Sequence, residues 1–397
     1  MSNHAAKEAL PANLSDHRAA KAWRQLEPAC PAPRQIEILK LKTKSAVYRL
    51  VGVGPGGLSV VAKRCRAATA TVERTIYDQF LASLPLPTLR CYGFVPEPAG
   101  DFGWLFVQDA GQHAYSPAND DHRALAGRWL GTIHRAELSA DLKARLPDRS
   151  PAHYLQSLHS ARAVMLEHMD NPVLSADEMA LLRRTAEQCD LIEAHWEELE
   201  NSFEGRPRSL VHGDFVIKNL RLRNGADEPT LLVYDWEMAG WGVPATDLAQ
   251  SLGRCASPDL ETYCSVLNQD LPERDIHAAS PSGAAPTVKR TEARAPRVEV
   301  SDLRRLADYG NLLRLVDKIF WDTVGIGGNT REFLLRPVLA LKNYEPQLEA
   351  ALRALDWKSP RPKAQSPKSE TCGASRDATA DFRREALASS QDWRPHD

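Results

Sequence analysis

The sequence has no excess of charge of either sign and no long hydrophobic run. Its 397 residues carry 50 Lys and Arg against 52 Asp and Glu, which gives a formal charge of −2. A chain that coats nucleic acid or an anionic membrane is strongly basic, so this balance argues against both partners. No apolar run reaches the roughly 18 residues that a membrane span needs. With 43% hydrophobic and 26% charged residues, the composition is that of a globular protein.

Paired cysteines and an N-terminal apolar segment are also missing. The seven cysteines are an odd number, scattered along the chain without a C-x-x-C pair. This pattern favours reduced thiols over a disulfide framework or a zinc site. The first residues, MSNHAAKEALPANLSDHRAAK, lack the hydrophobic stretch of a secretory signal. We therefore expect a cytoplasmic protein.

Three stretches lack the apolar periodicity of a packed core. Residues 1–30 are Ala-rich and polar, with room for one short helix over His17–Leu26. Residues 276–298 are a mixture rich in Pro, Ala, Ser and Thr, and residues 358–397 stay polar to the end. The sequence therefore predicts a flexible N-terminal segment, a disordered insertion and a disordered tail.

The rest of the chain is predicted to form two lobes. Residues 31–109 contain short β-rich runs such as AVYRLVGVG and GWLFVQD, with one helical pattern over 71–83. Residues 110–275 and 299–357 are dominated by long helical patterns, broken by one β-hairpin at about 220–235. This texture predicts an α+β fold, in which a small antiparallel sheet with one helix precedes a larger, mostly helical lobe.

The strongest chemical signal is the pair of segments VHGDFVIKNL and LLVYDWE. Asp214 and Asn219 are five positions apart, which is the D-x-x-x-x-N spacing of the catalytic loop in protein kinases. Asp235 ends an apolar strand, where a kinase places a Mg²⁺-binding carboxylate. Taken alone, HGD is often a turn and DW is often a capped strand end, but their joint spacing favours an active site.

The hairpin suggests how these side chains meet. Two strands over 220–224 and 230–235, joined by residues 225–229, would pair position 220 with 234. This register places Asn219 directly opposite Asp235, at the open end of the hairpin. An amide oxygen beside a carboxylate suits Mg²⁺ that is held together with ATP phosphates.

On these residues the chain resembles the aminoglycoside phosphotransferase family (APH/choline kinase-like), bacterial small-molecule kinases related to choline and homoserine kinases. The resemblance covers roughly residues 36–357. It implies a protein-kinase-like two-lobe fold, ATP and Mg²⁺ as cofactors, and phosphorylation of a hydroxyl group on a small molecule. The matching positions are His212, Gly213, Asp214 and Asn219 of the H-G-D-x-x-x-x-N signature, the downstream Asp235, and Asp247 in Asp-Leu-Ala.

The resemblance also implies a role for each of these residues. Asp214 is the expected catalytic residue, which orients the acceptor hydroxyl and takes its proton, while Asn219 and Asp235 hold the metal. His212 is expected to support the backbone of the catalytic loop. Asp247 is expected to hydrogen-bond that loop, or alternatively only to favour the N-terminus of the next helix.

The glycine-rich segment of the first lobe is interpreted as a hairpin tip. Residues 51–57, VGVGPGG, contain a formal G-x-G-x-x-G, but no helix follows and Lys63 is only six residues further on. That distance leaves room for one strand, so Gly54–Gly57 should join the second and third strands. The loop that covers the phosphates is then expected at Lys42–Ala46, where Ser45 offers a hydroxyl or a backbone N–H.

Lys63 ends the apolar run LSVVAK, at the position of the family's ATP-binding lysine. A buried lysine needs a partner, and the resemblance makes Glu73 on the following helix that partner; a solvated Lys and Glu are the alternative. Glu237 could reach a second metal or lie in solvent. Phe106–Asp109 should form the hinge between the lobes, with backbone groups that bind adenine. The candidate nucleotide-binding residues are therefore Lys63, Glu73, Ser45, Phe106 and Asp109.

Charge gives one indication about the acceptor. Residues 31–109 carry 10 basic and 6 acidic residues, whereas residues 110–275 carry 16 basic and 27 acidic residues. This split suits a polyanion at the first lobe and an amine-bearing acceptor, such as an aminoglycoside, at the second. Four residues on the last helical segment could face the cleft or form a solvated face with a buried Trp: Asp308, Asp317, Trp321 and Asp322.

Two alternatives stay open. The protein could be a kinase of another metabolite, such as an amino alcohol, a sugar or a nucleoside. It could also be a catalytically silent nucleotide-binding protein, whose expected mark is the loss of Lys63, Asp214, Asn219 or Asp235; all four are present. We expect neither a nucleic-acid nor a membrane partner, and the oligomeric state stays open.

Overall fold

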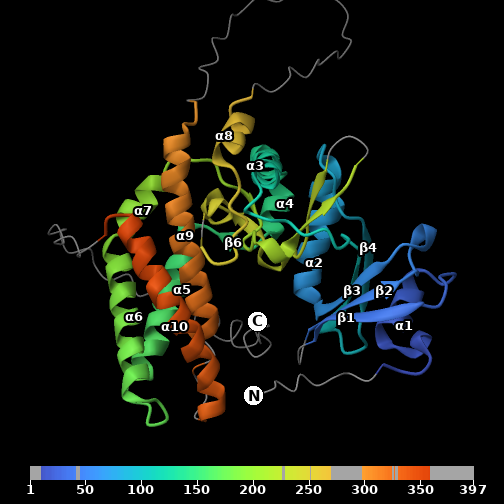
Figure 1. Cartoon of the computed structure of the whole chain (residues 1–397), viewed down its shortest axis with the longest axis horizontal. Coiled ribbons are helices and arrows are strands. Elements are labelled where there is room, and N and C mark those ends of the chain that lie inside the picture. The colour runs from blue at the N-terminus through green and yellow to red at the C-terminus, as the bar shows by residue number, and fades with distance from the viewer. Residues whose placement is uncertain are drawn as a thin grey trace, which may run out of the picture.

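The chain folds into two lobes, a blue sheet lobe and a green-to-red helical lobe in Figure 1. This α+β architecture confirms the predicted two-lobe fold. None of the helices in the described part of the chain is long and apolar enough to cross a membrane. The computed structural model describes residues 10–41, 45–225, 229–250, 252–269, 297–323, 326 and 330–357. The predictions for residues 1–9, for most of the insertion at 276–298 and for the tail at 358–397 lie outside these ranges.

The N-terminal lobe is built on a five-stranded antiparallel sheet with the strand order β1-β2-β3-β5-β4. Because side chains alternate across a strand, Tyr48, Leu50 and Ala62 are buried on one face while Lys63 lies on the other. The strands are β1 (Gln35–Leu41), β2 (Ala46–Val51), β3 (Val60–Arg66), β4 (Cys91–Pro96) and β5 (Phe102–Gln108).

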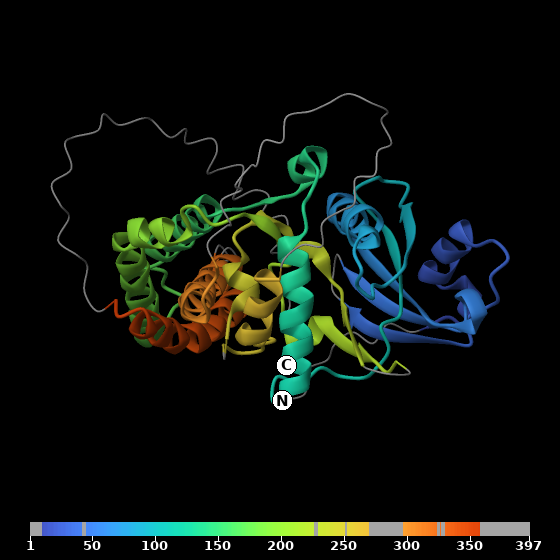
Figure 2. The ribbon, with the colours of Figure 1, turned by 90° about the horizontal axis from the view of Figure 1, so that it is seen from above.

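Helix α1 (Arg18–Leu26) covers the first of these faces (Figure 2). Its Trp23 is buried with the ring centroid 5.2 Å from that of Phe106, and Trp23 Nε1 donates to the carbonyl of Val53 at 3.2 Å. The short helix predicted over His17–Leu26 is therefore confirmed, whereas the prediction that residues 1–30 are flexible is wrong for its residues. The sequence did not show that this helix packs on the sheet, because its apolar stripe of Ala19, Ala22 and Trp23 is narrow.

Helix α2 (Ala67–Thr75) lies on the opposite face of the sheet, toward the helical lobe (Figure 2). The helical path continues as one wide turn and one tight turn to Ser83, so the predicted helix over 71–83 is present and begins earlier. The prediction for the glycine-rich segment is confirmed, because Pro55–Gly57 form a turn between the antiparallel strands β2 and β3.

The helical lobe contains a bundle of long helices beside its small sheets (Figure 1). The capping box of Ser175 and Glu178 is confirmed at the start of α6, but the helix predicted from there to about 201 breaks at His195. The helices are α3 (Asp120–Arg135), α4 (Ala140–Arg145), α5 (Pro151–Glu167), α6 (Ala176–Ala194), α7 (Trp196–Phe203), α8 (Leu260–Leu267), α9 (Val300–Thr323) and α10 (Arg331–Ala354).

Short strands in this lobe position the segments that contain Asp214 and Asp235. The order β6-β10-β7 forms one small sheet, and β8 and β9 form a separate hairpin. Helix α9 packs directly on the 3-10 helix η7 (Pro244–Leu248), since a Cβ on Gly310 would overlap the carbonyl of Ala245. The strands are β6 (Asp148–Arg149), β7 (Ser209–Val211), β8 (Leu220–Arg223), β9 (Thr230–Val233) and β10 (Gly240–Gly242).

Candidate active site

The loop that follows β7 is anchored by a buried carboxylate. Asp247 Oδ2 accepts a hydrogen bond from the backbone N–H of His212 at 2.6 Å, and Oδ1 accepts one from Gly213 at 3.0 Å. His134 Nε2 lies 3.4 Å from the same carboxylate. Burial opposes ionisation of Asp247, but the hydrogen bonds and charges around it hold its pKa below the usual range. The geometry thus agrees with the predicted contact between Asp247 and the loop.

His212 uses both ring nitrogens within the loop. Nδ1 accepts a hydrogen bond from the backbone N–H of Asp214 at 3.3 Å, so Nε2 carries the proton and donates to the carbonyl of Tyr234 at 3.1 Å. Burial lowers the pKa of His212 despite the nearby carboxylates, so the ring is neutral at physiological pH. These contacts fit a supporting role better than proton transfer.

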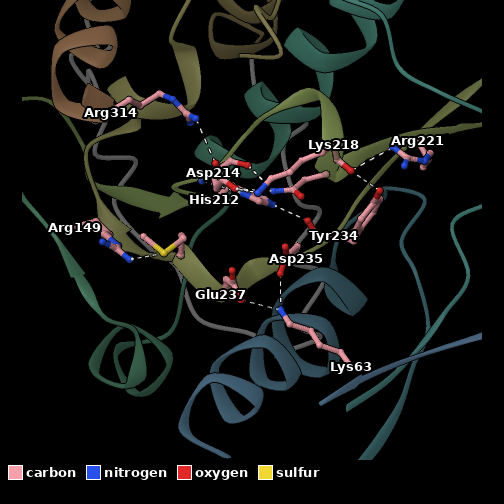
Figure 3. A network of polar contacts seen from close by, with 12 residues as sticks. Lys63, Arg149, His212, Asp214, Lys218, Arg221, Tyr234, Asp235, Glu237 and Arg314 are labelled. Carbon is pink, nitrogen blue, oxygen red and sulfur yellow. Dashed lines mark hydrogen bonds and ion pairs between the residues drawn. The ribbon is translucent and has the colours of Figure 1, made fainter. Parts of the chain in front are cut away.

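Asp214 lies at the centre of the polar network in Figure 3. Lys218 Nζ lies 3.1 Å from its Oδ2, where Asn219 Nδ2 also donates at 3.1 Å, and Arg314 Nη2 donates to its Oδ1 at 3.4 Å. Burial raises the pKa of this carboxyl, but the positive charges of Lys218 and Arg314 outweigh that effect and lower it. Asp214 is therefore ionised at neutral pH, and its side chain is still 26% exposed.

The hairpin after this loop corrects the predicted register by one residue. Leu220 pairs with Val233, and the carbonyl of Asn219 accepts a hydrogen bond from the backbone N–H of Tyr234 at 3.2 Å. Asn219 therefore lies opposite Tyr234 and not opposite Asp235. The pattern could not fix the register, because Leu231, Leu232 and Val233 are consecutive apolar residues and all are buried.

Asp235 leaves the ladder in a left-handed conformation, with φ 67° and ψ 65°. This uncommon geometry for a residue other than glycine turns the chain after β9 and aims the carboxylate at the first lobe. Asp235 Oδ1 accepts a hydrogen bond from Lys63 Nζ at 2.5 Å, although 172 positions separate the two residues. The loop after β9 thus connects to the first lobe through ion pairs with Lys63 (Figure 3).

Lys63 is the centre of a cluster of three carboxylates, which reaches from the buried Glu73 to the exposed Glu237. Its Nζ lies 2.5 Å from Glu73 Oε1 and 3.3 Å from Glu237 Oε2, in addition to the contact with Asp235. The predicted ion pair of Lys63 and Glu73 is confirmed. Burial opposes the charge of Lys63, but the surrounding carboxylates raise its pKa well above the usual value. Burial also raises the pKa of Glu73 to about 7, and the charge of Lys63 limits the rise.

The donor atoms at this point fit a hard divalent cation. Oxygens of Glu73, Asp235 and Glu237 lie within 4.8 Å of one another, and carboxylate oxygens are the ligands that Mg²⁺ prefers. Asn219 uses its amide nitrogen to donate to the carbonyl and carboxylate of Asp214, which leaves Oδ1 available to a metal. Glu73 is only 3% exposed, whereas Asp235 and Glu237 are 19% and 35% exposed, so the residues best placed to hold Mg²⁺ are Asn219, Asp235 and Glu237.

The predicted hinge begins later than expected. Phe106 pairs with Ala62 on one side and with Gly93 on the other, so its backbone belongs to the sheet ladder and its side chain to the core under α1. The prediction that Phe106 binds adenine is therefore wrong. β5 lies between two strands, and a residue inside it has no free backbone group. The connection to the second lobe starts at Asp109.

Asp109 does lie beside a groove, although its own carboxylate is engaged. Arg49 Nε donates to Asp109 Oδ2 at 2.8 Å, and the same guanidinium donates to Glu37 at 2.5 Å. Ser45 lies directly before β2, but residues 42–44 of the predicted phosphate-covering loop lie outside the described ranges. The groove measures about 850 Å³ and is lined by Leu58, Ser59, residues 108–113 and residues 222–224.

Three charged residues at the site had not been predicted. Lys218 lies inside the H-G-D-x-x-x-x-N segment and could have been noticed as a cation beside Asn219. Arg49 and Arg314 left no signal in the sequence. Each is one basic residue in a regular strand or helix, and only the packing of distant segments brings it to the site.

A two-lobe fold of this kind, in which a Lys–Glu pair of an antiparallel sheet faces an HGD loop and an aspartate loop, is that of a small-molecule kinase with a protein-kinase-like fold. A model of the phosphotransferase enzyme family (APH) matches residues 35–278. The chain belongs to this family. No curated protein matches it significantly.

Solved structures support the same fold. The structure of APH(2″)-IIIa with GDP and kanamycin gives a TM-score of 0.53 at 11% identity, over 82% of this chain and 97% of that one. The GDP complex of wild-type aminoglycoside 2′-phosphotransferase-IIIa gives 0.53 at 12% identity, over 82% and 97%. An ethanolamine kinase from Plasmodium vivax gives 0.51 at 13% identity, over 83% and 86%. At these identities the likeness concerns the fold.

Proposed function

We propose that this kinase transfers the γ-phosphoryl group of ATP, bound with Mg²⁺, to a hydroxyl group of a small molecule. The supporting observation is the convergence of side chains from three separate segments. Lys63 reaches Asp235 across the lobes at 2.5 Å, while Asn219 donates to Asp214 at 3.1 Å. A phosphate-binding cation, two oxygen ligands for a metal and an ionised base therefore lie together.

Asp214 is the proposed base. Its lowered pKa keeps the carboxylate ionised at neutral pH, so it can orient the acceptor hydroxyl and accept its proton. A bond forms between the acceptor oxygen and the γ-phosphorus, and the bond from that phosphorus to the leaving oxygen of ADP breaks. Because the transition state is loose, the proton moves late and most of the rate comes from positioning.

Lys63 is the proposed partner of the nucleotide phosphates. Glu73 holds the ammonium group in place, and Lys63 would exchange Asp235 for the phosphates when the nucleotide binds. Asp235 and Asn219 would then be free to hold Mg²⁺, which when bound neutralises charge on the phosphate oxygens. The ion pair of Lys63 and Asp235 would thus be replaced by two contacts, one between Lys63 and the phosphates and one between Asp235 and the metal.

The nucleotide base is proposed to lie near Asp109, where the groove passes between the start of β3, the hinge and β8. ATP is the nucleotide we propose. Two of the similar structures contain GDP, so GTP is the second nucleotide to compare.

For the acceptor, the names of the similar proteins and the charge of the helical lobe both suggest an amine. One of those proteins binds kanamycin and another is an ethanolamine kinase. The groups in contact with Asp214 have the opposite sign, however, because Lys218 and Arg314 are both cations. The residues next to the base, and not the average charge of the lobe, should decide which acceptor is used.

Binding of Mg·ATP and Mg·GTP to the full chain, measured by calorimetry, is the first test. Nucleotide consumption is then measured with aminoglycosides, amino alcohols, sugars, nucleosides and hydroxy acids. Asp214→Ala should lower kcat by roughly 10²–10⁴ with little change in the nucleotide KM, while Asp170→Ala in an exposed loop should change neither. Unchanged turnover in Asp214→Ala, or a failure to bind either nucleotide, would contradict the proposal.

A further inference from the structure

The side of Asp214 that faces helix α9 is lined by cations. Arg314 contacts Asp214 from this helix, and Lys318 follows one turn later. Residues four positions apart lie on the same face of a helix, so both cations are presented to the same region. The position of α9 is fixed nearby by Gly310, which packs on the carbonyl of Ala245 in the segment that carries Asp247.

Arg314 has more hydrogen-bond donors than partners. Its side chain is 3% exposed, and only Nη2 makes a contact, at 3.4 Å from Asp214. Within the described ranges, Nε and Nη1 are buried without a hydrogen-bond partner. Burying a cation with unused donors is unfavourable. If Arg314 served only to pair with Asp214, one nitrogen of the guanidinium would be used. The unfavourable burial of Nε and Nη1 would then have no explanation.

Lys318 has no ion pair within the part of the chain that the structure describes. Its ammonium group lies 5.9 Å from the ring centroid of Tyr344. Burial and the neighbouring charge of Arg314 lower the pKa of Lys318, as expected for a cation that lacks an anion. An anion placed between Arg314 and Lys318 would supply the missing partner to both.

The two nearby carboxylates of α9 do not contact Arg314. Asp322 Oδ1 accepts a hydrogen bond from Arg336 at 3.3 Å. Asp317 Oδ1 lies 3.8 Å from His153 Nε2, which is too long for a hydrogen bond, and this oxygen is buried without a hydrogen-bond partner among the described residues. Among the described residues, Asp214 is the only carboxylate in contact with Arg314. This arrangement would repel an ammonium group at the acceptor position and attract an anion.

We propose that the acceptor carries a carboxylate or phosphate group close to its reacting hydroxyl, and that Arg314 and Lys318 bind this anion. This inference rests on the proposed kinase function. The guanidinium fork suits two oxygens of a carboxylate or phosphate. Because Arg314 also touches Asp214, the anion and the hydroxyl would be only a few bonds apart, as in a short hydroxy acid or a sugar acid.

Lys218 has a different place in this scheme. Its side chain is 54% exposed, and its charge lowers the pKa of Asp235 as well as that of Asp214. Its ammonium group also lies 3.1 Å from Asp214 Oδ2, so replacing Lys218 would change the surroundings of the proposed base itself. Lys318, which is only partly exposed and lies a turn beyond Arg314, is the better residue with which to test the anion.

The test first establishes nucleotide binding and then adds a charge-matched pair of probes. Malonate and ethylenediamine are each added to the full chain with saturating Mg·ADP, at constant ionic strength, and Tm is measured. Malonate should raise the Tm of the wild type and have less effect on Lys318→Gln, while ethylenediamine should raise neither. Lys342→Gln, on an exposed position of α10, is the control with the same loss of charge. No response to malonate, an equal response in both variants, or a response to ethylenediamine instead would overturn the proposal.

Turnover provides the second readout. Gluconate is compared with glucitol and glucosamine, and glycerate with glycerol and ethanolamine. The anionic acceptors should have a kcat/KM at least roughly tenfold higher than their matched partners, and Lys318→Gln should raise KM for the anionic acceptors alone. An equal loss for all acceptors would assign Lys318 to the phosphoryl group or to the fold. If neither nucleotide binds, the kinase function itself fails, and the acceptor proposal fails with it.

Discussion

Gly213 packs so closely on Met238 that a Cβ at position 213 would overlap the carbonyl oxygen of Met238. The HGD loop and the loop of Asp235 therefore touch through their backbones. Gly213 also has φ 74°, which side chains rarely adopt. The glycine of the motif thus sets the distance between the proposed base and the proposed metal ligand.

Gly213→Ala should therefore lower both stability and activity. The left-handed backbone costs about 1 kcal/mol for alanine, and the overlap with Met238 adds about 1–3 kcal/mol. Urea unfolding measures the sum. Gly100→Ala is the matched control, since Gly100 has φ 83° but nothing within 4 Å of an added Cβ. An equal loss of stability in the two variants would show that the contact with Met238 does not contribute to the effect.

Removing the carboxylate of Asp247 should unfold the loop locally. Asp247→Ala leaves the buried N–H groups of His212 and Gly213 without an acceptor, so the free energy of unfolding should fall by about 2–4 kcal/mol. Amide exchange at residues 212–214 should accelerate in the same variant. Protected amides in Asp247→Ala would mean that other contacts hold the loop.

Stability should depend on pH through His212. Its pKa in the folded state lies below the unfolded value of about 6.5, so its contribution is fully present above pH 6.5 and is lost as pH falls through the folded pKa. Burial is the main cause of the lowered pKa, and a second proton on Nδ1 would in addition point at the backbone N–H of Asp214. Unfolding by urea at pH 7.5 and 5.5 should show a larger decrease for the wild type than for His212→Gln. If the free energy of unfolding decreases equally in both proteins, His212 is not the origin of the pH dependence.

Replacing Lys63 should expose the acidic cluster to metal. Lys63→Met leaves Glu73 buried beside Asp235 and Glu237, so stability should fall by about 3 kcal/mol. Millimolar MgCl₂ should then raise the Tm of this variant more than that of the wild type, because the cation takes the place of the ammonium group. NaCl at the same ionic strength is the control, and an equal shift with either salt would argue against a metal site.

Trp23→Ala should test whether α1 belongs to the sheet lobe. The buried indole packs on Phe106 and donates to Val53, so its loss should cost about 3–5 kcal/mol. Arg24→Ala, on the exposed face of the same helix, should change stability by less than about 0.5 kcal/mol. If the two variants are equally stable, the helix contributes nothing to the lobe.

Local patterns explain which predictions were confirmed. The strands of the first lobe, the turn at Gly54–Gly57 and the capping box at Ser175 each depend on a few consecutive residues. The pair of Lys63 and Glu73 also follows from short-range order, since one strand leads directly into one helix. The register of β8 and β9 was wrong because three successive apolar side chains fit either register. Phe106 was misplaced because the end of a central strand is not marked in the sequence.

The sequence by itself determined the fold class, the spacing of Asp214, Asn219 and Asp235, and the candidate lysine, because each is encoded within a short segment. Only the tertiary structure decided what surrounds them. Lys63 meets Asp235, and Arg314 meets Asp214, through contacts between residues 172 and 100 positions apart. The average charge of the helical lobe suggested a cationic acceptor, whereas the packing of α9 placed cations beside the base. Electrostatic interactions weaken with distance and are screened by solvent, so the nearest buried charges outweigh the average of the lobe.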